Sequence, residues 1–143
     1  MAELKEISYE TLTSHFRLLG NWEDRYRYIL DLGKKLPPFP PRYRTEEYRI
    51  HGCQSQVWMR LEWTGAPPTL DFLADSDAHL VRGIIAILYI LFRGRSAEEV
   101  LDLDVEAAVQ KLDLKQHLSP TRNNGLTAMI RRIQRSARAL TEG

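Results

Sequence analysis

The chain has 143 residues, which suits one domain, and its 20 basic and 19 acidic residues leave a formal net charge of only +1. This balance excludes a global field that would collect nucleic acid or anionic lipid, and the longest uncharged apolar run, residues 83–92, is too short for a membrane-spanning helix of about 20 residues. Because the single cysteine cannot form a disulfide within the chain and residues 1–10 do not resemble a secretion signal, we expect one cytoplasmic domain over residues 1–143.

Two helices are predicted at the start of the chain. Ser8 and Asn21 can each cap a helix, because each is followed by apolar residues at helical spacing. Gly20 and Gly33 stand where the two helices should end, and Gly20 suits a left-handed residue there. Four prolines in residues 37–41 then exclude a helix and predict a stiff connector.

The period of apolar residues changes to two after the connector. Alternation around residues 48–50, over 57–63 and around 70–72 predicts three antiparallel strands, with the prolines of 64–69 in the last turn. The link between the first two strands contains Gly52 and Cys53. Because glycine permits backbone angles that a strand interior does not reward, we expect Cys53 on a loop or bulge at one end of the sheet.

The remaining chain is predicted to be helical. Residues 75–77 can supply capping oxygens to a central helix whose apolar residues cover nearly every side. Ser96 begins a capping box, Asp104 can cap the next helix, and Pro120 is typical of a first helical position. Strands grouped together with helices around them indicate an α+β fold: a three-stranded antiparallel sheet with helices packed mainly on one face.

Five arginines between residues 122 and 138 raise the question of nucleic acid binding. No aromatic residue alternates with them to stack on bases, and the rest of the chain balances their charge. A solvated or partner-facing side of the last helix explains them better.

Metal binding and hydrolysis are poorly supported by the remaining candidates. The four histidines are scattered and a single cysteine leaves no Cys-x-x-Cys element, so no metal site is predicted. His51 is too close to Cys53 in sequence to be assumed a well-oriented base, and no third group is evident. We therefore assign no role to His51.

Cys53 carries the strongest candidate chemistry. A free cysteine is most often a buried apolar residue, but this one lies between a glycine and the polar stretch QSQ. Free backbone N–H groups in a loop and nearby cations can favour a thiolate, which is the nucleophilic form. From the residues alone, a structural thiol and a reactive loop thiol both remain open.

Four stretches of the sequence together resemble the SufE family of sulfur-acceptor proteins. They are NWEDRYRYILDLGKKLP at residues 21–37, GCQSQVW at 52–58, DSDAHLVRG at 75–83 and HLSPTRNNGLTAMI at 117–130. The resemblance covers nearly the whole chain, from about residue 21 to residue 140. Its motifs occur in the order expected of the family, and the QSQ after the cysteine favours SufE proper over its close paralogue.

The resemblance implies a fold shared with IscU-type scaffold proteins and a sulfur-transfer accessory protein that is not a stand-alone enzyme. Cys53 would receive sulfane sulfur as a persulfide from a SufS-type cysteine desulfurase, stimulate that enzyme, and pass sulfur to a downstream cluster-assembly scaffold. Pyridoxal phosphate would belong to the partner, and no cofactor or metal to this chain. Neither nucleic acid nor a membrane is an expected partner, and a weak homodimer stays open.

The same resemblance marks five further residues as loop-supporting or partner-facing: Gly52, Gln54, Ser55, Asp77 and Arg122. We expect Cys53 to be at least partly shielded in the free protein, with Gly52 as the pivot on which the loop swings outward. Two other functions stay open: an allosteric activator with a structural Cys53, and a cluster scaffold, which one thiol per chain disfavours.

Overall fold

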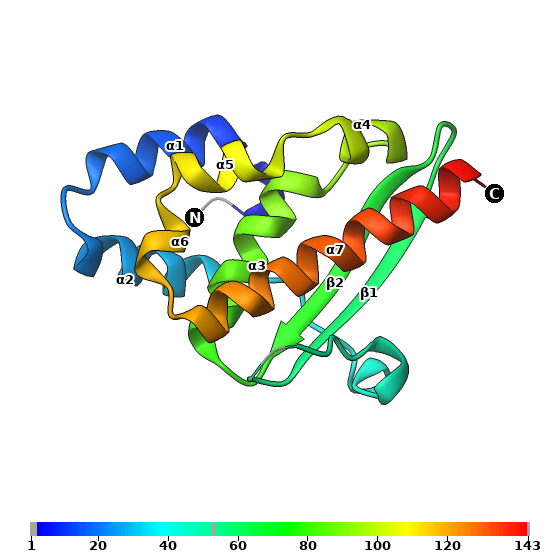
Figure 1. Ribbon diagram of the computed structural model, residues 1–143, viewed down its shortest axis with the longest axis horizontal. Helices are drawn as coiled ribbons and strands as arrows, with labels where there is room; N and C mark the ends of the chain where they lie inside the picture. Colours follow the sequence, from blue (N-terminus) through cyan, green and yellow to red (C-terminus); the bar gives the residue numbers. More distant parts are fainter. Residues whose placement is uncertain (1–2, 53, 143) are drawn as a thin grey trace.

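The computed structural model describes residues 3–52 and 54–142, which form two layers, with helices packed against a small sheet (Figure 1). The elements follow one another as η1 (Leu4–Glu6), α1 (Tyr9–Leu18), α2 (Trp22–Gly33), η2 (Pro41–Tyr43), η3 (Glu46–Tyr48), β1 (Val57–Thr64), β2 (Thr69–Ser76), α3 (His79–Phe92), α4 (Ala97–Asp102), α5 (Val105–Lys111), α6 (Leu114–His117) and α7 (Pro120–Glu142). The α+β class is confirmed. Within the described ranges, every helix is too short or too polar to cross a bilayer.

The sheet has two strands where the alternation of apolar residues predicted three. β1 and β2 are antiparallel, in a register that runs from Val57 opposite Ser76 to Thr64 opposite Thr69. The predicted first strand is reduced to a single bridge between Arg49 and Trp58. The prediction was wrong because residues 46–48 form a 3-10 turn, which leaves too few extended residues for a ladder.

The hydrophobic core packs against one face of the sheet. Residues directly opposite each other in an antiparallel pair share a face, so Met59 and Ala74 point the same way, and both are buried. Helices α3 and α7 cover this face: Phe72 packs edge-on against Tyr89 of α3, and α7 crosses the strands in Figure 1. The opposite face receives the segment that contains η2, where the guanidinium of Arg60 lies over the ring of Tyr43.

Helix α3 is buried on nearly all sides, as its composition predicts. It crosses α2 at two glycines, and a Cβ atom added at Gly83 would lie 2.3 Å from the carbonyl oxygen of Ile29. Gly33 does end α2, but its backbone is not left-handed, and a Cβ there would lie 2.7 Å from the Gly83 nitrogen. Both glycines are therefore required by the close approach of the two helices.

Most predicted caps are confirmed. The side chains of Ser8, Asn21 and Asp104 each accept from the backbone N–H three residues on, and Ser96 forms a complete capping box. Gly20 does not take the predicted left-handed conformation, since α1 ends at an extended residue 19.

The predicted capping of α3 by residues 75–77 was also wrong. Strand β2 continues through Ser76, and the residue that precedes α3 is Ala78, whose methyl group cannot cap it. The three polar side chains are therefore free to make other contacts, and these contacts define the candidate site.

Candidate functional site

The candidate loop runs from Ile50 to Val57 at one end of the sheet. Its base is closed by a hydrogen bond of 2.9 Å from the backbone nitrogen of Ile50 to the carbonyl oxygen of Val57. Gly52 has a φ of 92°, in the region that only glycine adopts readily, as its predicted place in a loop requires. Cys53 lies outside the described residues, so the prediction that it sits on this loop, shielded, stays a prediction.

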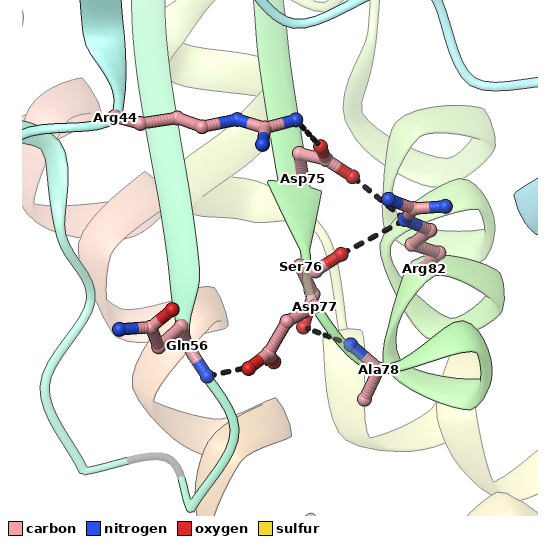
Figure 2. Close-up of polar contacts among 7 residues, drawn as sticks. All are labelled: Arg44, Gln56, Asp75, Ser76, Asp77, Ala78 and Arg82. Carbon is pink, nitrogen blue, oxygen red and sulfur yellow. Dashed lines mark hydrogen bonds and ion pairs between the residues drawn. The ribbon is translucent and has the colours of Figure 1, made fainter. Parts of the chain in front are cut away.

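Asp77 holds the second half of the loop. Its Oδ1 accepts a hydrogen bond of 3.0 Å from the backbone nitrogen of Gln56 (Figure 2). Its own backbone nitrogen donates to the Gln56 carbonyl oxygen at 3.3 Å. The two bonds run in opposite directions between the same pair of residues. They fasten Gln56 to the turn between β2 and α3. The loop-supporting role that the family resemblance gives Asp77 stays a prediction.

Asp75, at the end of β2 before this turn, forms ion pairs with two arginines. Its Oδ2 lies 2.6 Å from a guanidinium nitrogen of Arg44, and its Oδ1 lies 2.9 Å from Nε of Arg82 (Figure 2). Asp75 is only 9% exposed, and a carboxylate so buried is stable only when it is paired. We call these three residues the Asp75 clamp, because they join the 41–48 segment, β2 and α3.

The clamp also shapes the turn that carries Asp77. Nε of Arg82 donates a second hydrogen bond of 2.8 Å to the carbonyl oxygen of Ser76, and the Ser76 hydroxyl accepts one of 3.2 Å from the nitrogen of Ala78. The backbone on either side of Asp77 is thus held by side chains. The chain of contacts runs from α3 through the turn to Gln56 in the loop.

A narrow hollow lies under the loop between α3 and α7. Gln54 and Ser55 line it from the loop side, and Arg122 lines it from the first turns of α7. The other lining residues are mostly apolar: Val81, Ile84, Thr121, Gly125, Leu126 and Met129. The space open to the centre of a water molecule is about 20 Å³, enough for one or two small atoms.

The structure therefore brings most of the predicted residues together, but in two groups. Gln54, Ser55 and Arg122 share the hollow, whereas Asp77 contacts Gln56 outside it. Gly52 lies on the other half of the loop, where a Cβ would be 3.6 Å from the Cβ of Ala128 in α7.

Sequence reasoning missed the clamp. The DSD stretch predicts a helix cap, but no local signal pairs Asp75 with Arg44, which is 31 residues away. His51, to which no role was assigned, is exposed, and its Nε2 lies 2.6 Å from a carboxylate oxygen of Glu46. In the described ranges, no three histidine, aspartate or glutamate side chains gather where they could hold a metal ion.

The sequence model of the SufE family, described as an Fe–S metabolism associated domain, matches residues 10–137. The chain belongs to the SufE family. An uncharacterized SufE-like protein of Rhizobium meliloti is 45% identical over 132 residues, which cover 91% of this chain and 94% of that protein. A second one, from Rhizobium etli, is 41% identical over 133 residues, or 92% and 90% of the two chains.

The fold of this SufE-family chain is also found among solved structures. The solution structure of a hypothetical protein from Thermus thermophilus superimposes with a TM-score of 0.75 over all of both chains, at 24% identity. At that identity the likeness speaks for the fold alone. Family membership places the protein in iron–sulfur metabolism.

Proposed function

We propose that this protein is a sulfur acceptor and carrier: Cys53 takes sulfane sulfur as a persulfide from a SufS-type cysteine desulfurase, stimulates that enzyme, and passes the sulfur on for iron–sulfur cluster assembly. One observation carries the proposal. The SufE family match, over residues 10–137, includes position 53, the only cysteine of the sequence. The setting is a reducing cytoplasm, and the chain needs no cofactor of its own.

The chemistry requires only a thiolate and a donor persulfide. The Cys53 thiolate attacks the outer sulfur of the donor persulfide, a new S–S bond forms, the donor S–S bond breaks, and the donor cysteine leaves as a thiolate. The attacking thiolate supplies the electron pair of the new S–S bond and the departing donor thiolate keeps the pair of the old one, so no outside oxidant or reductant is needed. The absence of a second cysteine preserves the product, because a resolving thiol would turn the persulfide into a disulfide.

The geometry of the flanking residues supports a carrier that protects its cargo. Gln54 and Ser55 border a hollow that is mostly apolar and has room for one or two small atoms. A persulfide housed there would be shielded from cellular thiols. Its delivery would then require the loop to leave α7, which breaks the two Asp77–Gln56 hydrogen bonds.

Intact mass measures sulfur acceptance directly. After incubation with a SufS-type desulfurase, cysteine and pyridoxal phosphate, the wild-type chain should gain the mass of one sulfur atom, and reductant should remove it. Cys53→Ser should gain nothing, whereas Ser14→Ala, a control at an exposed position of α1, should still accept sulfur. An unmodified wild-type chain under these conditions would rule out the carrier function.

Stimulation of the desulfurase separates the carrier from a purely allosteric activator with a structural Cys53. A carrier loses most of the stimulation in Cys53→Ser, because each turnover needs a sulfur acceptor. An allosteric activator keeps the stimulation in the same variant. The measurement is the rate of alanine release by the desulfurase with each chain at saturating concentration.

A further inference from the structure

A strip of arginines on α7 lies beside the first half of the candidate loop. Arg131, Arg132 and Arg135 line one surface hollow together with residues 50–52. Arg131 and Arg135 are four residues apart and therefore lie on the same side of the helix. We call these three residues the arginine strip. It borders the half of the loop that Asp77 does not hold.

The charges of the arginine strip are not neutralised within the described residues. None of its three side chains forms an ion pair there, whereas cations elsewhere do, as Arg27 does with Glu23. Arg132 donates one hydrogen bond of 3.3 Å to the carbonyl oxygen of Glu47, which orients it without cancelling its charge. Residues 114–141 contain six basic residues and no acidic one.

The carboxylates of Glu46 and Glu47, on the segment beside the strip, have other partners. An oxygen of Glu46 lies 2.6 Å from Nε2 of His51. Glu47 lines a surface hollow together with Arg132 and Arg135, and its side chain is the first cause of the raised pKa of Tyr48, through hydrogen bonding. The strip therefore keeps its positive charge available to an external group.

One apolar side chain of the sheet borders the arginines. Leu61 of β1 is half-buried and lines a second hollow that shares Arg132 and Arg135 with the first, while Met59, which also lines it, is buried. Arginines around an apolar floor are typical of protein–protein interfaces. Nucleic acid binding would favour a free aromatic ring among the cations, but the ring of Tyr48, which borders the second hollow, already packs edge-on against Tyr43.

We propose that the arginine strip is the docking surface for an acidic face of the protein that supplies the sulfur. The proposal rests on the proposed function, because it takes the donor as the occupant. Carboxylates on the donor would meet Arg131 and Arg135 while an apolar side chain covers Leu61. Docking here brings the donor to the Gly52 half of the loop and leaves the Asp77 half fastened until contact is made.

Binding without transfer tests this proposal. Arg131→Glu/Arg135→Glu is made in a Cys53→Ser chain and titrated into a SufS-type desulfurase by calorimetry, at about 50 mM and about 300 mM NaCl. At low salt the Kd should weaken by about tenfold or more, and its dependence on salt should flatten, because two attractive charges become repulsive.

Two matched variants separate the effect of the strip from that of net charge alone and from that of the arginine side-chain shape. Arg17→Glu/Lys111→Glu makes the same change of net charge at exposed positions of α1 and α5 and should bind within about twofold of the parent chain. Arg131→Lys/Arg135→Lys keeps the charge and should retain most of the affinity. Thermal unfolding of each variant establishes that it is folded.

The outcomes separate this proposal from the proposed function. Unchanged affinity in the charge-reversed chain would overturn the docking surface, while sulfur gain by the wild type would leave the carrier function standing. If the wild type binds a 20-base-pair DNA duplex, and charge reversal abolishes that binding but not desulfurase binding, the strip is a nucleic acid site and the proposal is wrong. No desulfurase binding by any chain would overturn both.

Discussion

Two neighbouring residues of α3 make contacts of different kinds: Arg82 makes polar contacts, and Gly83 makes a close packing contact. Arg82 ties the start of α3 to the candidate site through the Asp75 clamp, in which its guanidinium is partly exposed. Gly83, the next residue, lies against the backbone of α2 with no space for a methyl group. The packed contact makes α3 a rigid platform. The polar contacts of Arg82 are partly exposed and can break and re-form in water, which the proposed opening of the loop would require.

Breaking the packed contact should have the largest effect. In Gly83→Ala the new Cβ would meet the Ile29 carbonyl oxygen at 2.3 Å, and neither backbone can move without separating α2 from α3. The gain of about 1 kcal/mol in helix propensity cannot offset this, and we expect a net loss of about 2–3 kcal/mol or failure to fold. Urea unfolding followed by circular dichroism measures the change.

Gly20→Ala is the matched control for that prediction. A Cβ at Gly20 meets nothing within 4 Å, and its backbone is not left-handed. Its stability should change by less than about 0.5 kcal/mol. If the two alanine variants unfold at the same urea concentration, the close crossing of α2 and α3 does not hold α3 in place.

Removing the clamp should have an intermediate effect. Asp75→Ala leaves Arg44 and Arg82 without their shared carboxylate, but both guanidiniums are about 40% exposed and can recover water. We therefore expect a loss of about 1–2 kcal/mol, well below that of a fully buried broken pair.

The exposed pair of Glu23 and Arg27 provides the comparison, since Glu23→Ala should cost less than about 0.5 kcal/mol. Equal losses in Asp75→Ala and Glu23→Ala would mean that burial of the clamp adds nothing. Thermal unfolding of both variants at neutral pH decides this.

Releasing the loop should have the smallest effect on stability and a clear effect on reactivity. Asp77→Ala removes a carboxylate that is exposed, so unfolding should shift by less than about 1 kcal/mol. Because Gln56 loses a partner, we expect a small alkylating reagent to label Cys53 several times faster than in the wild type.

Asp77→Asn sharpens the measurement, because its amide oxygen can still accept from the Gln56 nitrogen and should keep labelling close to the wild-type rate. Equal labelling rates in the wild type, Asp77→Asn and Asp77→Ala would show that this contact does not guard the thiol. A wild-type rate equal to that of a free cysteine peptide would show that Cys53 is not shielded at all.

The sequence by itself determined the features that depend on near neighbours. The caps at Ser8, Asn21, Ser96 and Asp104 were predictable because each joins residues a few positions apart. The buried character of α3 was also predictable, since it follows from apolar residues on every side. Family membership rests likewise on local motifs in a given order.

The tertiary structure alone decided the features that join distant segments. Asp75 meets Arg44 across 31 residues and Gln56 meets Asp77 across 21, and neither pairing leaves a periodic trace in the sequence. The prediction of a strand at residues 48–50 was wrong for the same reason. Apolar alternation there cannot distinguish an extended ladder from a 3-10 turn followed by a single bridge. The alternation of apolar residues indicates which side chains are buried, whereas strand pairing depends on which segment lies alongside in the fold.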